Sequence, residues 1–209
     1  MNLLFDIKIN SYPIIFVFWN IFLALLPCFI AWLTYKIFKN KRWSKTKWYQ
    51  KLLFPLLFIS WFFFFPNTAY LFTVVRHLID HCINYDPILR VCRRETWMIM
   101  FFFVYALIGV PTFIYALKKM SSVLGTLFHK TIAIVFPAIM IPLTAMGVLL
   151  GLIERFNTWN IVHDPLIIVR TGLGYFIDPD MIWNFIAYTV LLYFIYYSMT
   201  LIIKYLKNN

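Results

Sequence analysis

The chain has 209 residues, of which 63% are hydrophobic, 21% are aromatic and only 13% are charged. A soluble domain of this length could not keep so much apolar surface away from water, so the composition excludes the ordinary soluble classes and favours an integral membrane protein. The net charge of +11 could suit a nucleic-acid partner, but the basic residues sit in short segments beside apolar runs and no nucleic-acid motif accompanies them. We therefore expect membrane lipids rather than nucleic acid as partners.

Five apolar runs predict an all-α bundle of five transmembrane helices, which forms a single membrane domain over residues 1–209. The expected spans are 13–35, 52–75, 97–117, 131–153 and 183–203. Residues 166–176, in the longest loop, predict a short helix on the membrane interface. Loops 36–51 and 118–130 and the C-terminal tail hold eleven of the twelve lysines. The positive-inside rule then places the N-terminus outside and the C-terminus in the cytoplasm of a multi-pass protein of the cell membrane.

The second span contains a Pro-Asn break. Within this span, only 14 residues precede Pro66. They form about 21 Å of helix, whereas the hydrocarbon core is about 30 Å thick, so the break lies inside the membrane. Pro66 leaves the carbonyl near Phe62 without its usual donor, and Asn67 is placed to repair that deficit. At 100° per residue, an arc of about 120° collects five polar side chains, Asn67, Tyr70, Thr73, His77 and His81. We expect this stripe to face the bundle interior at the outer leaflet, either as a hydrogen-bonded seam between helices or as a ligand pocket.

Two segments resemble motifs of a bacterial family of multi-pass membrane proteins catalogued as domain of unknown function 1361. Residues 66–78, P-N-T-A-Y-L-F-T-V-V-R-H-L, are similar to its signature L-P-N-A-P-Y-x-x-T-D-x-x-H-L. Residues 151–160, G-L-I-E-R-F-N-T-W-N, are similar to its second motif, G-R-F-x-R-x-N-S-W-D. The order and spacing of the spans agree too, so the resemblance covers most of the chain. It implies a shared topology and a shared pocket but no activity, because the family has no established role.

Four positions depart from those motifs. Ala69 and Leu152 replace a proline and an arginine, and Val74 and Asn160 stand where the family motifs have aspartates. If the family uses the carboxylate at position 74 for catalysis or for a metal, this chain lacks it.

We predict a ligand-binding site where the broken span meets the segment that follows the fourth span. The predicted set is Asn67, Tyr70, Thr73, His77, Arg155, Asn157 and Trp159. Asn67 and Thr73 would orient a ligand, His77 would move a proton or contact the ligand, and Arg155 would hold an anionic group such as a lipid phosphate. The alternative for the second segment is a membrane boundary, with Trp159 anchored among headgroups and Arg155 on lipid phosphate.

Metal and redox chemistry have weaker support. His77 and His81 are spaced for one metal, but no third ligand follows at a diagnostic spacing, so we expect neither a metal nor a cofactor. Cys82 and Cys92 share a loop predicted to face outward, where they could form a disulfide or remain two free thiols.

Three functions fit these features. The first is binding of a small solute or lipid headgroup in an outer-leaflet pocket, as a transport component, since broken spans are typical of transporters. The second is a structural or assembly subunit that packs against other membrane proteins. A membrane-embedded enzyme on a lipid-linked substrate is the least favoured, because no G-x-S-x-G, Walker loop or H-E-x-x-H occurs and the two aspartates are missing. The sequence does not identify the ligand or the oligomeric state.

Overall fold

The computed structural model describes residues 8–9, 12–39, 42–77, 85–86, 91–92, 96–158 and 160–208. Its helices are α2 (Ile14–Phe38), α3 (Trp48–Phe64), α4 (Pro66–Tyr70), α6 (Trp97–Leu107), α7 (Gly109–Leu127), α8 (Lys130–Ile153), α9 (Asn160–His163), α10 (Pro165–Gly174) and α11 (Pro179–Asn208). Two 3-10 helices are η1 (Trp43–Lys45) and η2 (Leu71–Arg76). Two short antiparallel strand pairs join β1 (Lys8–Ile9) to β2 (Tyr12–Pro13) and β3 (Tyr85–Asp86) to β4 (Val91–Cys92).

Five helical stretches are long and apolar enough to cross a membrane, which confirms the predicted all-α architecture of a multi-pass membrane protein. They are Ile14–Phe38, Trp48–Arg76, Trp97–Leu127, Lys130–Ile153 and Pro179–Asn208. The short helix predicted between the last two spans is α10. The sidedness of the membrane stays a prediction from the distribution of lysines.

The third span runs ten residues further than expected, to Leu127, so most of residues 118–130 is helix rather than loop. The prediction ended this span at the first lysines. Lysine is a good helix former, and its long stem can lie along apolar surface while the ammonium stays near water. Beyond the lysines, Met120, Val123 and Leu127 continue the helical spacing of buried apolar side chains, and this pattern extends α7.

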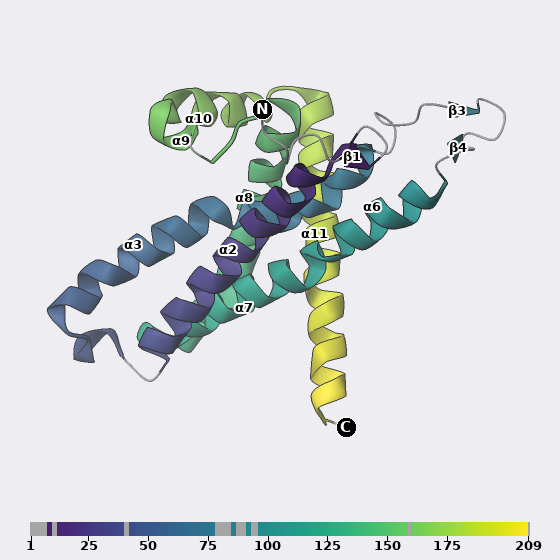
Figure 1. Ribbon diagram of the computed structural model, residues 1–209. Helices are drawn as coiled ribbons and strands as arrows, with labels where there is room; N and C mark the ends of the chain where they lie inside the picture. The colour runs from purple at the N-terminus through teal and green to yellow at the C-terminus, as the bar shows by residue number, and fades with distance from the viewer. Residues whose placement is uncertain are drawn as a thin grey trace, which may run out of the picture.

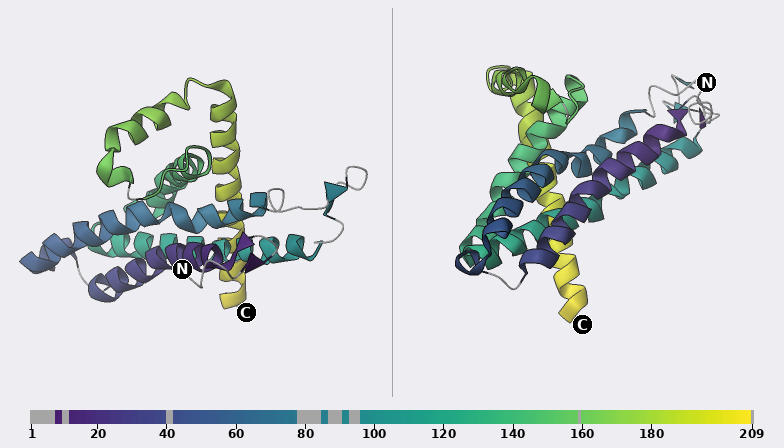
Figure 2. Two further views of the ribbon diagram at one scale, coloured as in Figure 1. Left: turned by 45° about the horizontal axis from the view of Figure 1, so that its top comes forward. Right: turned by 60° about the vertical axis from the view of Figure 1, so that its left-hand side comes forward.

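The helices form two crossing groups. Helix α2 packs along α7 and against α3, and α7 packs in turn on α8. In Figure 2, α2, α3 and the α6–α7 pair run alongside one another, while α8 and α11 cross them. Helix α10 lies at one end of the molecule and the C-terminal end of α11 projects from the other (Figure 1). Helix α11 leaves most of its apolar surface uncovered.

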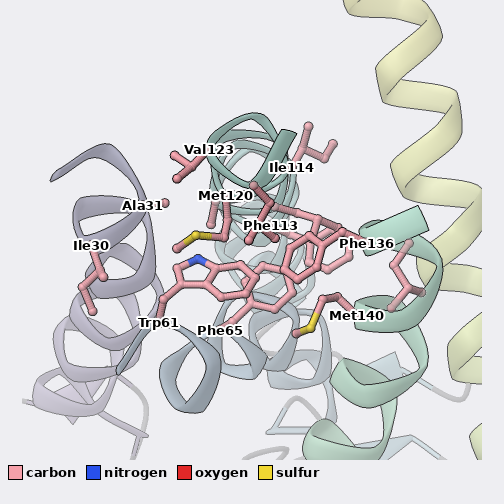
Figure 3. Packing of buried hydrophobic residues seen from close by; sticks show 14 of the residues in the cluster. Ile30, Ala31, Trp61, Phe65, Phe113, Ile114, Met120, Val123, Phe136 and Met140 are labelled. Carbon is pink, nitrogen blue, oxygen red and sulfur yellow. The ribbon is translucent and has the colours of Figure 1, made fainter. Parts of the chain in front are cut away.

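The core is a stack of aromatic rings at the place where α3 ends. The ring centroids of Trp61 and Phe65 are 4.5 Å apart, and Phe113 of α7 stacks on Phe65 at 5.4 Å. Phe136 of α8 approaches Trp61 at 5.7 Å (Figure 3). Pairs of this kind contribute about 0.5–1.5 kcal/mol each beyond the burial of their surface. Because the break at Pro66 follows directly after Phe65, this rigid stack fixes where the break lies.

Candidate functional site

The break in the second span is a repaired helix rather than an unwound segment. Phe65, between α3 and α4, keeps helical angles of φ −58° and ψ −39°. The Asn67 amide donates to the carbonyl of Phe64 at 3.0 Å, and the Thr68 hydroxyl donates to the carbonyl of Phe65 at 2.8 Å. Side chains thus satisfy carbonyls around the proline, as hydrocarbon surroundings require. The predicted bond from Asn67 to the Phe62 carbonyl is not among the hydrogen bonds of the described residues, because Asn67 donates to Phe64 and Thr158 instead.

Asn67 also joins the two motif segments. Its amide nitrogen lies 3.4 Å from the hydroxyl oxygen of Thr158, in the loop that follows α8. This distance is long for a hydrogen bond, so the contact is weak and can be exchanged for a better acceptor. The segments around residues 67 and 158, 91 positions apart in the sequence, therefore meet at one point.

A cavity of about 400 Å³ opens at this meeting point, between α2, the α3–α4 break, the end of α8 and the following loop. Its polar lining residues are Asn20, Asn67, Tyr70, Asn157 and Thr158. Its apolar lining residues are Phe16, Trp19, Leu23, Phe63, Phe64, Pro66, Gly147, Leu150, Gly151, Phe156 and Ile168. Among the described residues, none that lines this cavity is charged. An apolar wall that carries a few amides and hydroxyls is the usual design of a small-molecule site.

Two glycines of α8 shape the cavity. Gly147 and Gly151 are four residues apart and share one face of the helix, a spacing that lets neighbouring helices approach closely. A Cβ atom on Gly147 would lie 2.9 Å from Cγ of Pro66, whereas one on Gly151 would lie 3.6 Å from the ring of Tyr70. Helix α4 is thus held against α8 at Gly147, and the Tyr70 ring lies over Gly151.

The loop after α8 reverses direction at Arg155, which has a left-handed φ of 58°. The backbone N–H of Phe156 returns to the carbonyl of Leu150 at 3.3 Å, and this bend carries Asn157 and Thr158 back to the cavity. The side-chain oxygen of Asn160 then accepts from the backbone N–H of Asn157 at 2.7 Å. Asn160 therefore holds the loop in place, a role that needs an oxygen acceptor and no charge.

The structure brings together three of the seven predicted site residues, Asn67, Tyr70 and Asn157. Arg155 is exposed and is not part of the lining. Thr73 is buried and donates to the carbonyl of Tyr70 at 2.8 Å, and His77 lies against the rings of Tyr12 and Phe102, at centroid distances of 5.1 and 6.3 Å. Trp159 lies outside the described residues, as do His81, Cys82 and the side chain of Cys92, so the disulfide stays a prediction.

Among the described residues, the predicted stripe does not line the cavity beyond Tyr70, where the helix changes type. It is α-helical to Tyr70 but 3-10 from Leu71 to Arg76. A 3-10 helix turns 120° per residue instead of 100°, so six such residues add a rotation of about 120°. The angles extrapolated at 100° per residue therefore do not hold beyond Tyr70, and His77 packs on Tyr12 and Phe102 instead of lining the cavity. Val74, expected within the stripe, is buried in an apolar cluster with Met98 and Phe102.

Sequence reasoning missed three residues of this region. Asn20 is an amide inside the otherwise apolar first run, and that contrast could have identified it. Thr158 stood inside the second motif without being selected. Arg76 was assigned to the loop, yet its guanidinium donates to the carbonyl of Leu152 at 3.2 Å and, among described residues, its buried Nε has no hydrogen-bond partner.

The positive charge of Arg76 acts on the groups around the C-terminal end of α8. Its bond to Leu152 places a cation at the C-terminal end of α8, where carbonyls lack helical partners and the helix dipole favours positive charge. Burial and, to a smaller extent, nearby Tyr70 raise the pKa of Tyr12 to about 12, and the charge of Arg76 acts in the opposite direction. Tyr12, Tyr70 and Arg76 are therefore close neighbours beside the cavity.

A second cavity adjoins the first. It has a volume of about 590 Å³, lies between α8, α10, α11 and the α3–α4 break, and is lined almost wholly by apolar side chains. The two cavities share five lining residues, Phe63, Pro66, Gly147, Leu150 and Ile168. Together they place a polar compartment beside a larger apolar one. Within the described ranges, no group of three or more His, Cys, Asp or Glu side chains is placed to hold a metal.

The comparisons with known proteins identify a family but no function. A family model described as "Protein of unknown function (DUF1361)" matches residues 19–199. That range contains both motif segments and every described lining residue of the polar cavity except Phe16. No curated protein and no solved structure matches the chain.

Proposed function

The chain belongs to the DUF1361 family of multi-pass membrane proteins, and we propose that it binds a small solute or a lipid headgroup, as a transport component, in the cavity around Asn67. The observation that carries this proposal is the meeting of the two motif segments at Asn67 and Thr158, at the wall of a 400 Å³ cavity. That volume lies within the range of about 300–1,000 Å³ that is usual for small-molecule sites.

The lining indicates the chemistry of the bound group. Amides and hydroxyls supply its polar contacts, and no charged side chain is present among its described lining residues. A charged ligand would lose its water there without gaining an opposite charge, at a cost of several kcal/mol, of the order found for a buried ion. An uncharged group with hydroxyls or amides fits better, since it can exchange hydrogen bonds with Asn20, Asn67 and Thr158.

The adjoining apolar cavity favours a lipid over a free solute. An amphiphile could place its uncharged head beside Asn67 and its chain along the 590 Å³ compartment, where Met140, Leu143 and Phe185 are among the lining residues. Each buried CH₂ group adds about 0.8 kcal/mol relative to water, although a chain taken from the bilayer gains much less. The shared wall of the two cavities therefore suits a molecule with both parts.

The test is the retention of lipid by the purified protein. Wild type, Asn67→Ala and Thr158→Val would be purified from the same membranes, and co-purifying lipids would be identified by mass spectrometry. Thr158→Val keeps the volume of the side chain but removes its hydroxyl. Loss of one hydrogen bond costs about 1 kcal/mol, so we expect the retained amount of one specific lipid to fall about fivefold. Thr126→Val is the matched control, because that hydroxyl only donates to the carbonyl of Ser122 on an exposed surface.

Arg155→Ala distinguishes this proposal from the prediction that Arg155 holds an anionic ligand. Since Arg155 is exposed and does not line the cavity, its loss should leave lipid retention unchanged. The proposal fails if wild type, Asn67→Ala and Thr158→Val all fold and retain the same lipids in the same amounts.

A further inference from the structure

A third cavity lies apart from the two described above and shares no residue with either. It has a volume of about 500 Å³ and lies between α2, α7 and α11. Its wall combines two lysines, Lys118 and Lys119, with the rings of Tyr35 and Tyr115 and with the apolar side chains of Met199 and Ile203. Positive charge and apolar surface thus face the same space.

The aromatic rings hold one of the two cations in place. The Lys119 ammonium lies 4.0 Å from the ring centroid of Tyr35 and 5.6 Å from that of Tyr115. A cation over an aromatic face gains about 0.5–1 kcal/mol, or more when it is desolvated. Lys118 and Lys119 are both partly buried, and both side chains belong to the lining. The pair therefore presents two positive charges at a partly buried site.

The three helices around this cavity offer these lysines no nearby opposite charge. The sequence has no acidic residue between Asp6 and Asp80, none between Glu95 and Glu154, and none after Asp180. Helices α2 and α7 lie wholly within the first two intervals. In α11, Asp180 is 19 residues before Met199, about 28 Å along the helix. An anion that neutralises the two lysines must therefore come from outside these three helices.

We propose that this cavity binds the phosphate group of an anionic phospholipid from the surrounding bilayer. Lys118 and Lys119 contact the phosphate, and an acyl chain lies along Met199 and Ile203. Basic pockets between membrane helices, with aromatic residues at headgroup depth, are suited to such lipids. The lysine distribution predicts that this end of the molecule faces the cytoplasm, where the leaflet carries anionic lipids.

Native mass spectrometry of the full chain tests this proposal. The protein would be titrated with phosphatidylglycerol and, separately, with phosphatidylcholine of the same chain length. We expect wild type to prefer phosphatidylglycerol. Each basic residue near a membrane surface contributes about 1 kcal/mol to the binding of anionic lipid. The preference should therefore fall about fivefold in Lys118→Gln and about 30-fold in Lys118→Gln/Lys119→Gln. The control is Lys45→Gln/Lys51→Gln, which removes the same charge from two exposed positions and should keep the preference.

Two further measurements address the lipid chain and the source of the phosphate. Ile203→Trp fills the cavity without changing charge and should weaken binding of both lipids, which a purely electrostatic surface would not show. Inorganic phosphate at equal concentration should not displace phosphatidylglycerol. The proposal is overturned if phosphate competes equally, if Ile203→Trp binds as wild type does, or if the control loses as much preference as the cavity variant. Should the double variant not fold, Lys118→Gln and Ile203→Trp decide the question.

Discussion

The close approach of α4 to α8 makes Gly147→Ala the sharpest test of the structure. The added Cβ would lie 2.9 and 3.0 Å from two ring atoms of Pro66. Those atoms belong to a ring closed on the backbone, so they cannot rotate away and the two helices must separate. Overpacking of this kind costs about 1–3 kcal/mol. Replacing glycine by alanine inside a helix returns about 1 kcal/mol, which leaves a net loss of up to about 2 kcal/mol.

Thermal unfolding in detergent, followed by circular dichroism at 222 nm, measures this effect. A loss of up to about 2 kcal/mol corresponds to a Tm lower by up to about 8 °C for a chain of this size. Gly174→Ala is the matched control, because its Cβ would have no heavy atom within 4 Å, and its Tm should be unchanged or higher. If Gly147→Ala is as stable as wild type while Gly174→Ala behaves as expected, α4 and α8 do not approach as closely as described.

Two smaller predictions concern the region beyond α8. Asn160→Asp should keep Tm within about 1 °C of wild type, because a carboxylate oxygen can accept from the Asn157 N–H just as the amide oxygen does. The pKa of Tyr175 is raised to about 12 by burial and by its contact with Glu154, so the folded state favours the neutral phenol. The resulting stability is present below about pH 10 and is lost as pH rises through 12, so wild-type Tm should fall more steeply than that of Tyr175→Phe over this range; equal slopes would contradict it.

The sequence was sufficient for features set by local chemistry. Five spans could be counted because the length of an apolar run and the thickness of a bilayer are directly comparable. A side-chain hydrogen bond of Asn67 near Pro66 could be expected because a proline removes a donor wherever it occurs in a helix, but its acceptor, Phe64, was not the one predicted. The end of the third span was placed too early because the apolar run ends at Lys118 and Lys119. The helix itself continues to Leu127, since its buried face stays apolar.

The arrangement of the site depended on features that the sequence does not display. The change from α to 3-10 geometry after Tyr70 results from tertiary packing, and no proline or glycine between Leu71 and Arg76 signals it. Extrapolating 100° per residue across that change gave angles for Thr73 and His77 that the structure does not keep, and neither residue lines the cavity. Likewise, nothing local indicates that Thr158 would return to Asn67 across 91 positions, since that contact depends on the left-handed turn at Arg155.

The 3-10 geometry also explains what the replacement of an aspartate by Val74 means for function. Residues three apart are eclipsed in a 3-10 helix, so Val74 and His77 lie on one face. Val74 belongs to the same buried cluster as Phe102, and the ring centroids of His77 and Phe102 are 6.3 Å apart. The family motif that this segment resembles has an aspartate at the first of these positions, which would set a carboxylate beside the imidazole. In this chain position 74 is a buried valine, whereas Asn67 and Thr158 make their contact at the cavity. The contact that carries the proposed binding site therefore does not depend on a carboxylate at position 74.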